Sequence, residues 1–157
     1  MPNQLLHVLV VDDNRDNADI VRSYLDATRE FVVSVAYDGD EAIDRFREGR
    51  PDLVLLDVMM PGKDGWEVCR TIKADPEHAA RTRVIMVTAR DELADKRTAL
   101  QSGADDFLEK PLDLSKLLGT IRRNAAALPA RKVESASRKP GASDATPGSA
   151  AAPETNA

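Results

Sequence analysis

Two hydrophobic periods alternate along the first 128 residues of the chain. Short runs rich in branched apolar residues, typical of buried strands, occur at residues 6–11, 31–36, 53–56, 84–88 and 104–108. Between these runs, apolar residues recur three and four positions apart, which is the pattern of amphipathic helices. Five strands that alternate with five helices predict an α/β fold with a doubly wound parallel sheet covered on both faces.

The helical segments also carry the end signals of helices. Gly49 comes just before Arg50-Pro51, Asp75 precedes Pro76, and Gly103 follows Ser102. Glycine and proline are common just beyond the last turn of a helix, because they cannot continue it. The expected helices lie around residues 20–25, 42–46, 66–72, 92–102 and 114–121.

The composition changes sharply after Leu128. Residues 129–157 consist mostly of Ala, Ser, Pro, Gly and Thr and contain no aromatic residue. Such a segment buries too little apolar area to offset the entropy lost on ordering. We therefore expect a folded domain at residues 1–128 and a disordered tail or linker at residues 129–157.

Charge and cysteine content narrow the class of protein. A formal net charge of −5 argues against a general nucleic-acid or acidic-membrane binder, which normally carries a basic face. The single cysteine, Cys69, excludes an internal disulfide and fits a reducing compartment. No apolar run approaches the ~20 residues of a membrane span. These features predict a cytoplasmic protein without direct contact to nucleic acid or membrane.

Polar residues follow four of the five strands. Asp12 and Asp13 come after the first strand, Asp57 after the third and Lys110 after the fifth, while Thr88 ends the fourth. Each has an ordinary local explanation, such as a helix cap, an Asx-turn or a solvated side chain. Ligands of open α/β sheets, however, bind beyond the carboxyl ends of the strands, where these side chains could meet.

A convergence of three carboxylates would need a compensating cation. Each close pair repels by roughly 4 kcal/mol at an effective dielectric constant near 20. The three acids and Lys110 sum to a charge of minus two, which suits one divalent ion. Oxygen ligands with open positions favour Mg²⁺, with water and a phosphoryl group as further ligands.

Five motifs in this order resemble the receiver domain of two-component response regulators. They are LVVDDN at the first strand, LLDVMMPGKDG at the third, MVTA at the fourth, and GADDFL and EKP at the fifth. The resemblance extends from about Leu5 to Leu128. It implies a flavodoxin-like fold with strand order 2-1-3-4-5, and a phosphoprotein of a phosphorelay that signals when phosphorylated.

The resemblance also implies roles for individual residues. Asp57 would accept a phosphoryl group from a sensor histidine kinase or phosphotransfer protein. Asp13 would bind Mg²⁺ directly and Asp12 mainly through water, with Asp57 and the backbone carbonyl of Met59 as further ligands. Lys110 would pair with a phosphoryl oxygen, and its bond to the following proline would be cis. The turn at Pro61-Gly62 would let the next loop pass the site without a bulky Cβ.

A switch would follow phosphorylation. By resemblance, the Thr88 hydroxyl moves to the new phosphoryl oxygen and Phe107 swings inward. The surface that changes is the helix at about 92–102, the fifth strand and the last helix, where an unknown downstream protein would bind. The resemblance also implies that the side chains of Met59 and Arg90 would tune how long the phosphoryl group lasts. Neither can orient an attacking water, so we expect slow self-dephosphorylation.

A small Mg²⁺-dependent phosphatase with an aspartate nucleophile is an alternative of a different class. Such an enzyme typically needs a second acid two residues after the nucleophile, where this chain has Met59, and a cap over the site. Flavin binding is disfavoured because Asp12 and Asp13 would repel a flavin phosphate. We therefore expect no enzyme, apart from catalysis of the chain's own phosphorylation and dephosphorylation. No output domain is visible after Leu128, and the sequence leaves open whether the phosphorylated form is a homodimer.

Overall fold

The five strands form one parallel sheet in the order β2-β1-β3-β4-β5, as predicted. In the computed structural model, residues 5–77, 80–89, 101 and 103–129 are described. By internal contacts the chain divides into residues 1–127 and 128–157, and the first unit holds the whole sheet. The strands are β1 (Leu6–Val11), β2 (Phe31–Ala36), β3 (Leu53–Asp57), β4 (Arg83–Thr88) and β5 (Asp106–Glu109).

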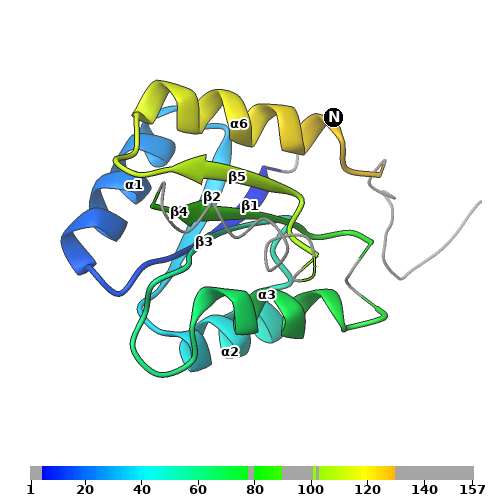
Figure 1. The fold of residues 1–157 in the computed structure, drawn as a ribbon. Helices are drawn as coiled ribbons and strands as arrows, with labels where there is room; N and C mark the ends of the chain where they lie inside the picture. The colour runs from blue at the N-terminus through cyan, green and yellow to red at the C-terminus, as the bar shows by residue number, and fades with distance from the viewer. Residues whose placement is uncertain (1–4, 78–79, 90–100, 102, 130–157) are drawn as a thin grey trace, which may run out of the picture. The chain divides into compact units, whose positions relative to one another are not determined.

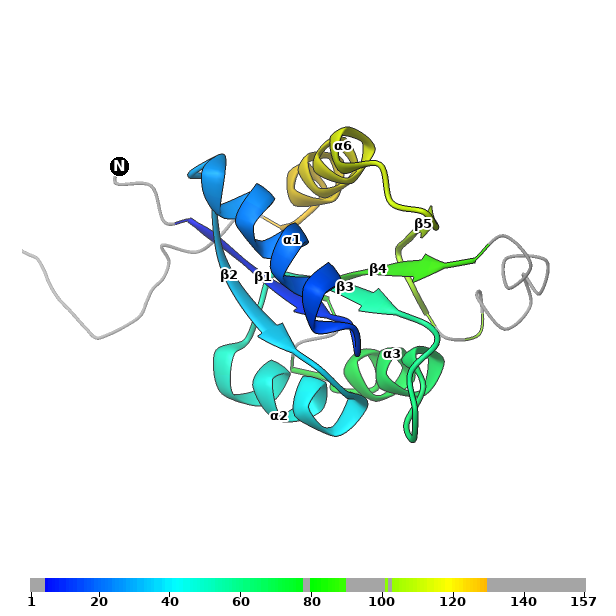
Figure 2. The ribbon, with the colours of Figure 1, turned by 90° about the vertical axis from the view of Figure 1, so that its left-hand side faces the viewer.

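Helices cover both faces of the sheet (Figures 1 and 2). In the described part of the chain they are α1 (Arg15–Ala27), α2 (Gly39–Gly49), α3 (Gly65–Lys73) and α6 (Leu114–Ala126). Helices α1 and α6 lie on one face, and α2 and α3 on the other. The predicted helix at 92–102 falls outside the described residues. None of the described helices is both long and apolar enough to cross a membrane.

The sheet separates two apolar layers because side chains alternate along each strand. All five residues of β3 are buried, as expected for a central strand of a parallel sheet. Leu53 and Leu55 join the layer beneath α1 and α6, whereas Val54 and Leu56 join the layer beneath α2 and α3. This packing fixes the end of β3, and therefore Asp57, between the two layers.

The strand β5 differs from its prediction. It covers Asp106–Glu109 rather than residues 104–108. Asp105 lies beside β4 without continuing the strand, because its side chain accepts the N–H of Val84 at 2.8 Å. Its carboxylate also pairs with Lys73 of α3 at 2.7 Å. The carboxylate of Asp105 thus accepts a backbone N–H of β4 that the apolar pattern predicts to bond to the backbone of β5.

Each described helix begins with a side-chain cap at the carboxyl edge of the sheet. Four N-cap residues accept a backbone N–H from the first turn of their helix, which satisfies a donor that has no partner within the helix. They are Asn14 of α1, Asp38 of α2, Asp64 of α3 and Asp113 of α6. Because Asn14 caps α1, neither Asp12 nor Asp13 is needed for that role.

Candidate functional site

Asp57 is a buried carboxylate at the carboxyl end of the central strand β3. Its side chain is 4% exposed, and its Oδ1 lies 2.7 Å from the Nζ of Lys110. The same oxygen accepts the N–H of Met59 at 3.3 Å, so the Asx-turn considered from the sequence exists beside the ion pair. Burial raises the pKa of Asp57, and the ammonium of Lys110 offsets only part of this effect.

Two further acids converge on Asp57. One carboxylate oxygen each from Asp12, Asp13 and Asp57 lies within 4.8 Å of the other two. This proximity follows from the strand order, because β1 and β3 are neighbours and Val11 pairs with Leu56. We name Asp12, Asp13 and Asp57 the acid cluster.

The two acids that follow β1 differ in environment. Asp13 is exposed, whereas Asp12 is half-buried and accepts the N–H of Asn14 at 2.9 Å. Burial raises the pKa of Asp12, and this hydrogen bond offsets part of the rise. The acid cluster therefore offers only oxygen ligands, some buried and some open to solvent, which is the donor set that Mg²⁺ prefers.

The ends of β4 and β5 close the other side of the site. Thr88 is fully buried and follows Val87, the residue that pairs with Asp57 across the β3–β4 ladder. Its carbonyl accepts the backbone N–H of Lys110 at 2.9 Å, which ties the residue after β5 to the end of β4. The Lys110–Pro111 bond is cis, as predicted. The structure thus assembles Asp12, Asp13, Asp57, Thr88 and Lys110 at one edge of the sheet.

A profile of the response regulator receiver domain family matches residues 8–122. The chain belongs to this family. Its match covers the sheet except the first two residues of β1, the described helices except the end of α6, and every residue of the acid cluster.

Solved receiver domains resemble the chain over most of its length. CheY4, a chemotaxis protein of Vibrio cholerae, is 28% identical with a TM-score of 0.71, and the match covers 76% of this chain and 98% of CheY4. A receiver domain of a signal transduction histidine kinase from Syntrophus aciditrophicus is 30% identical with a TM-score of 0.71, with 77% and 90% of the two chains covered. A response regulator receiver domain from Bermanella marisrubri is 30% identical with a TM-score of 0.69, with 78% and 99% covered.

The structure describes two of the three other predicted residues of this receiver domain, Phe107 and Met59. Phe107 of β5 is partly buried and packs against the apolar layer beneath α2 and α3. Met59 is 63% exposed, and its backbone N–H donates to the carboxylate of Asp57. Arg90, the second predicted rate-tuning residue, falls outside the described residues.

The loop after Asp57 corrects one prediction. Gly62 has φ +75°, a conformation that favours glycine, but a Cβ there would meet nothing within 4 Å. The close approach occurs instead at Gly65, where a Cβ would lie 2.3 Å from the carbonyl oxygen of Asp57. Gly62 is therefore needed for the turn, and Gly65 for space beside the site. The sequence does contain a signal for the role of Gly65. Asp64, a typical N-cap residue, directly precedes Gly65 where the apolar spacing of a helix begins.

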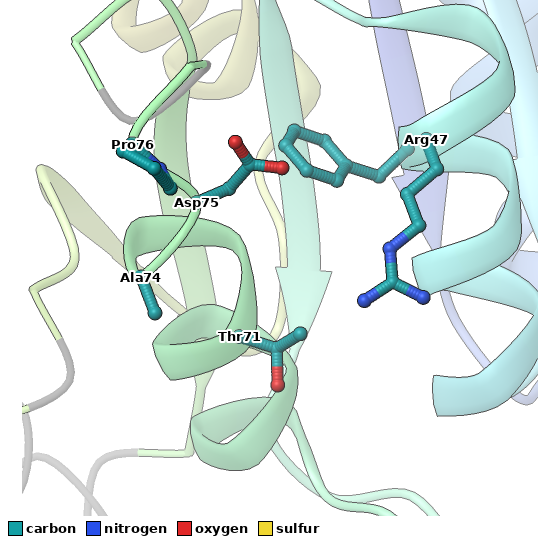
Figure 3. A pocket seen from close by; sticks show the side chains of 6 residues that line it. Arg47, Thr71, Ala74, Asp75 and Pro76 are labelled. Atoms are coloured by element: carbon teal, nitrogen blue, oxygen red, sulfur yellow. The ribbon is translucent and has the colours of Figure 1, made fainter.

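A separate groove of about 420 Å³ lies between α2 and α3. Figure 3 shows Arg47 on one side of it and Thr71, Ala74, Asp75 and Pro76 on the other. These residues lie at the carboxyl ends of the two helices, whereas the acid cluster lies at the edge where the helices begin. The groove contains none of the predicted site residues.

Proposed function

We propose that the chain is a phosphorylation-controlled signalling module and that Asp57 is its phosphoacceptor. The observation that carries the proposal is the environment of this carboxylate. It is buried at the end of a central strand, 2.7 Å from an ammonium group and beside two further carboxylates. Membership of the receiver family supports phosphorylation-dependent signalling in general, and the residue assignments are the proposal.

The proposed reaction transfers a phosphoryl group from a histidine of a sensor kinase or phosphotransfer protein. The phosphorus–nitrogen bond of the donor breaks as a carboxylate oxygen of Asp57 bonds to phosphorus, and the imidazole leaves with the electron pair. Such transfers depend mainly on positioning and charge neutralisation. Lys110, already paired with Asp57, is placed to neutralise a phosphoryl oxygen.

The acid cluster suits one divalent cation in this proposal. Asp13, which is exposed, and Asp57 would bind the ion directly, Asp12 mainly through water, and the backbone carbonyl of Met59 would add a fourth oxygen. Bound Mg²⁺ would neutralise charge on the carboxylates and on the transferred group. A phosphatase of this type would need a second acid two residues after Asp57, where the chain has Met59, so we propose catalysis only of the chain's own phosphorylation and dephosphorylation.

The proposed output is a change of surface around Thr88 and Phe107. The Thr88 hydroxyl donates to the carbonyl of Ala89 at 3.3 Å, a long bond that a phosphoryl oxygen could replace. Phe107 would then move inward, altering β5 and α6 for a downstream protein or a second copy of the chain. Arg122 and Arg123 of α6 already pair with Glu30 and Asp106, so these two side chains are less available to a partner.

Phosphorylation by a small donor tests the proposal. The chain is incubated with acetyl phosphate and Mg²⁺, and the product is followed by phosphate-affinity electrophoresis and intact mass. The wild type should gain one phosphoryl group, Asp57→Asn should gain none, and the exposed helix variant Asp19→Asn should behave as the wild type. Equal phosphorylation of Asp57→Asn would refute the assignment, and size exclusion of the phosphorylated form would decide between monomer and dimer.

The lifetime of the modification is a second readout. Met59 carries no group that could orient a water molecule for attack on phosphorus. Phosphorylated wild type should therefore lose the group slowly in Mg²⁺ buffer, and Met59→Asn should lose it faster. A half-life of seconds for the wild type would contradict this part of the proposal.

A further inference from the structure

The loop between β3 and α3 passes between two buried glycines. It covers residues 58–64, directly after Asp57, and includes Met59. Gly39 is the first residue of α2 and Gly65 is the first residue of α3. Both are buried, and both lie where any side chain would collide with backbone atoms of this segment.

Gly65 contacts the peptide that carries the proposed phosphoacceptor. A Cβ at this position would lie 2.3 Å from the carbonyl oxygen of Asp57 and 2.8 Å from the Cα of Val58. Real Cβ atoms do not approach backbone atoms so closely. The N–H of Gly65 also donates to the carbonyl of Val58 at 2.9 Å, so the first turn of α3 is bonded to the loop as well as packed against it.

Neither side of this contact can retreat easily. Val58 is bonded to the sheet, because its N–H donates to the carbonyl of Val87 at 3.0 Å. On the other side, Val68, Cys69 and Ile72 anchor α3 in the apolar layer. An added methyl group would therefore separate the first turn of α3 from Val58 and carry the connecting residues, including Met59, with it.

Gly39 makes a second contact at the far side of the loop. A Cβ there would lie 2.7 Å from the carbonyl oxygen and 2.8 Å from the Cβ of Lys63. An ion pair between Lys63 and Asp40, 3.4 Å apart, joins the same two segments. The loop is thus held between the starts of α2 and α3.

We propose that Gly65 and Gly39 are positioning residues for the cation and phosphoryl site. By admitting the backbone of the loop, they set where the carbonyl of Met59 lies relative to the carboxylate of Asp57. The inference rests on the proposed function, because the loop matters only if Met59 and Asp57 share a Mg²⁺ ion. In this proposal Gly65 and Gly39 strengthen Mg²⁺ binding although neither supplies a ligand atom to the ion.

Alanine substitution combined with Mg²⁺ titration tests this proposal. Gly65→Ala, Gly39→Ala and the wild type are titrated with Mg²⁺ by calorimetry. Circular dichroism establishes folding, and amide NMR shifts of Val58 and Met59 in the metal-free proteins report the position of the loop. We expect dissociation constants about 10- to 100-fold weaker in the folded variants, as for residues that orient metal ligands. The Val58 and Met59 amide shifts should change in the same variants.

Gly119→Ala is the matched control. Gly119 lies within α6, and a Cβ there would meet nothing within 4 Å. Alanine favours a helix by ~1 kcal/mol over glycine, so this variant should be slightly more stable and should bind Mg²⁺ as the wild type does. Comparison with Gly65→Ala and Gly39→Ala separates the effect of a glycine beside the loop from the general effect of replacing glycine by alanine.

The outcomes separate this inference from the proposed function. If the wild type binds Mg²⁺ and Gly65→Ala folds and binds it equally well, the inference is wrong and the proposed function stands. If Gly65→Ala does not fold, Gly39→Ala decides by the same criterion. Loss of folding in both variants would assign the glycines a structural role and overturn the inference. A wild type that neither binds Mg²⁺ nor becomes phosphorylated would instead overturn the proposed function.

Discussion

Replacing Asp13 by asparagine should stabilise the metal-free protein and weaken its response to Mg²⁺. The substitution keeps the shape of the side chain and removes one charge from the acid cluster. The carboxylate oxygens lie within 4.8 Å of one another, and at that limit a pair repels by ~0.9 kcal/mol in water and ~3.5 kcal/mol at an effective dielectric constant of 20. Because Asp13 is exposed, the lower figure applies. The substitution relieves two repulsive pairs, with Asp12 and with Asp57, and loses one attraction, to Lys110. With the three interactions taken as equal in size, the free energy of unfolding should rise by about 1 kcal/mol.

Magnesium should reverse this order of stability. At a concentration ~100-fold above its dissociation constant, a ligand of the native state adds ~2.7 kcal/mol to the free energy of unfolding. A variant that binds ~100-fold more weakly gains only ~0.4 kcal/mol under the same conditions. The wild type should therefore be less stable than Asp13→Asn in chelator and more stable in Mg²⁺.

Urea denaturation followed by circular dichroism measures both effects. Each protein is unfolded in chelator and in Mg²⁺ at low ionic strength, with Asp19→Asn, an exposed position on α1, as the control. The control should match the wild type within about 0.5 kcal/mol in both buffers. If Asp13→Asn is no more stable than the wild type in chelator, the acid cluster is not electrostatically strained. If the order does not reverse in Mg²⁺, Asp13 does not bind the ion.

The pH dependence provides an independent check. Burial raises the pKa of both Asp12 and Asp57, so each carboxylate costs stability when ionised. When the pKa of an acid is raised in the folded state, the ionised acid destabilises the protein. This cost disappears as the pH falls through the raised pKa and the acid is protonated. The advantage of Asp13→Asn in chelator should therefore shrink in acid, as the charges that repel Asp13 are neutralised. An advantage that grows in acid would contradict the reasoning.

Three further predictions concern parts of the fold outside the acid cluster. Asn124→Ala should cost about 1–3 kcal/mol in urea denaturation, because this buried side chain accepts from Arg83 at 3.0 Å and donates to Asp106 at 2.9 Å; a smaller loss would show that water replaces it. Burial alone would raise the pKa of Asp106, but hydrogen bonds from Asn124 and Arg123 outweigh it and lower that pKa. The stability advantage of wild type over Asp106→Asn should thus be full above about pH 4 and fade as the pH falls through the lowered pKa; an advantage that persists in acid would rule this out. Arg50→Gly should raise the melting temperature by relieving a positive φ of 46° worth about 1 kcal/mol, whereas a lower melting temperature would mean that the arginine side chain itself contributes.

Much of the architecture could be predicted because its signals are local. Apolar runs and three–four spacing follow from the pitch of strands and helices, so they identified all five strands and the four helices in the described part of the chain. The start of β4 lies one residue before its prediction and that of β5 two residues after it. The larger error, at β5, occurs where Asp105 pairs with Lys73 and with the N–H of Val84. These partners lie 32 and 21 positions away along the chain, and no local period reports them.

The sequence by itself determined which residue types follow each strand, and from them the candidates Asp12, Asp13, Asp57, Thr88 and Lys110. Only the tertiary structure decided that they meet, because strand order is set by crossover connections and not by the strands themselves. It also decided that Asn14, rather than either neighbouring acid, caps α1, and that Gly65, rather than Gly62, lies against the backbone of Asp57. Charge and hydrophobic spacing are local properties that can be read from neighbouring residues. The distances between residues far apart in the sequence are set only when the helices pack onto the sheet.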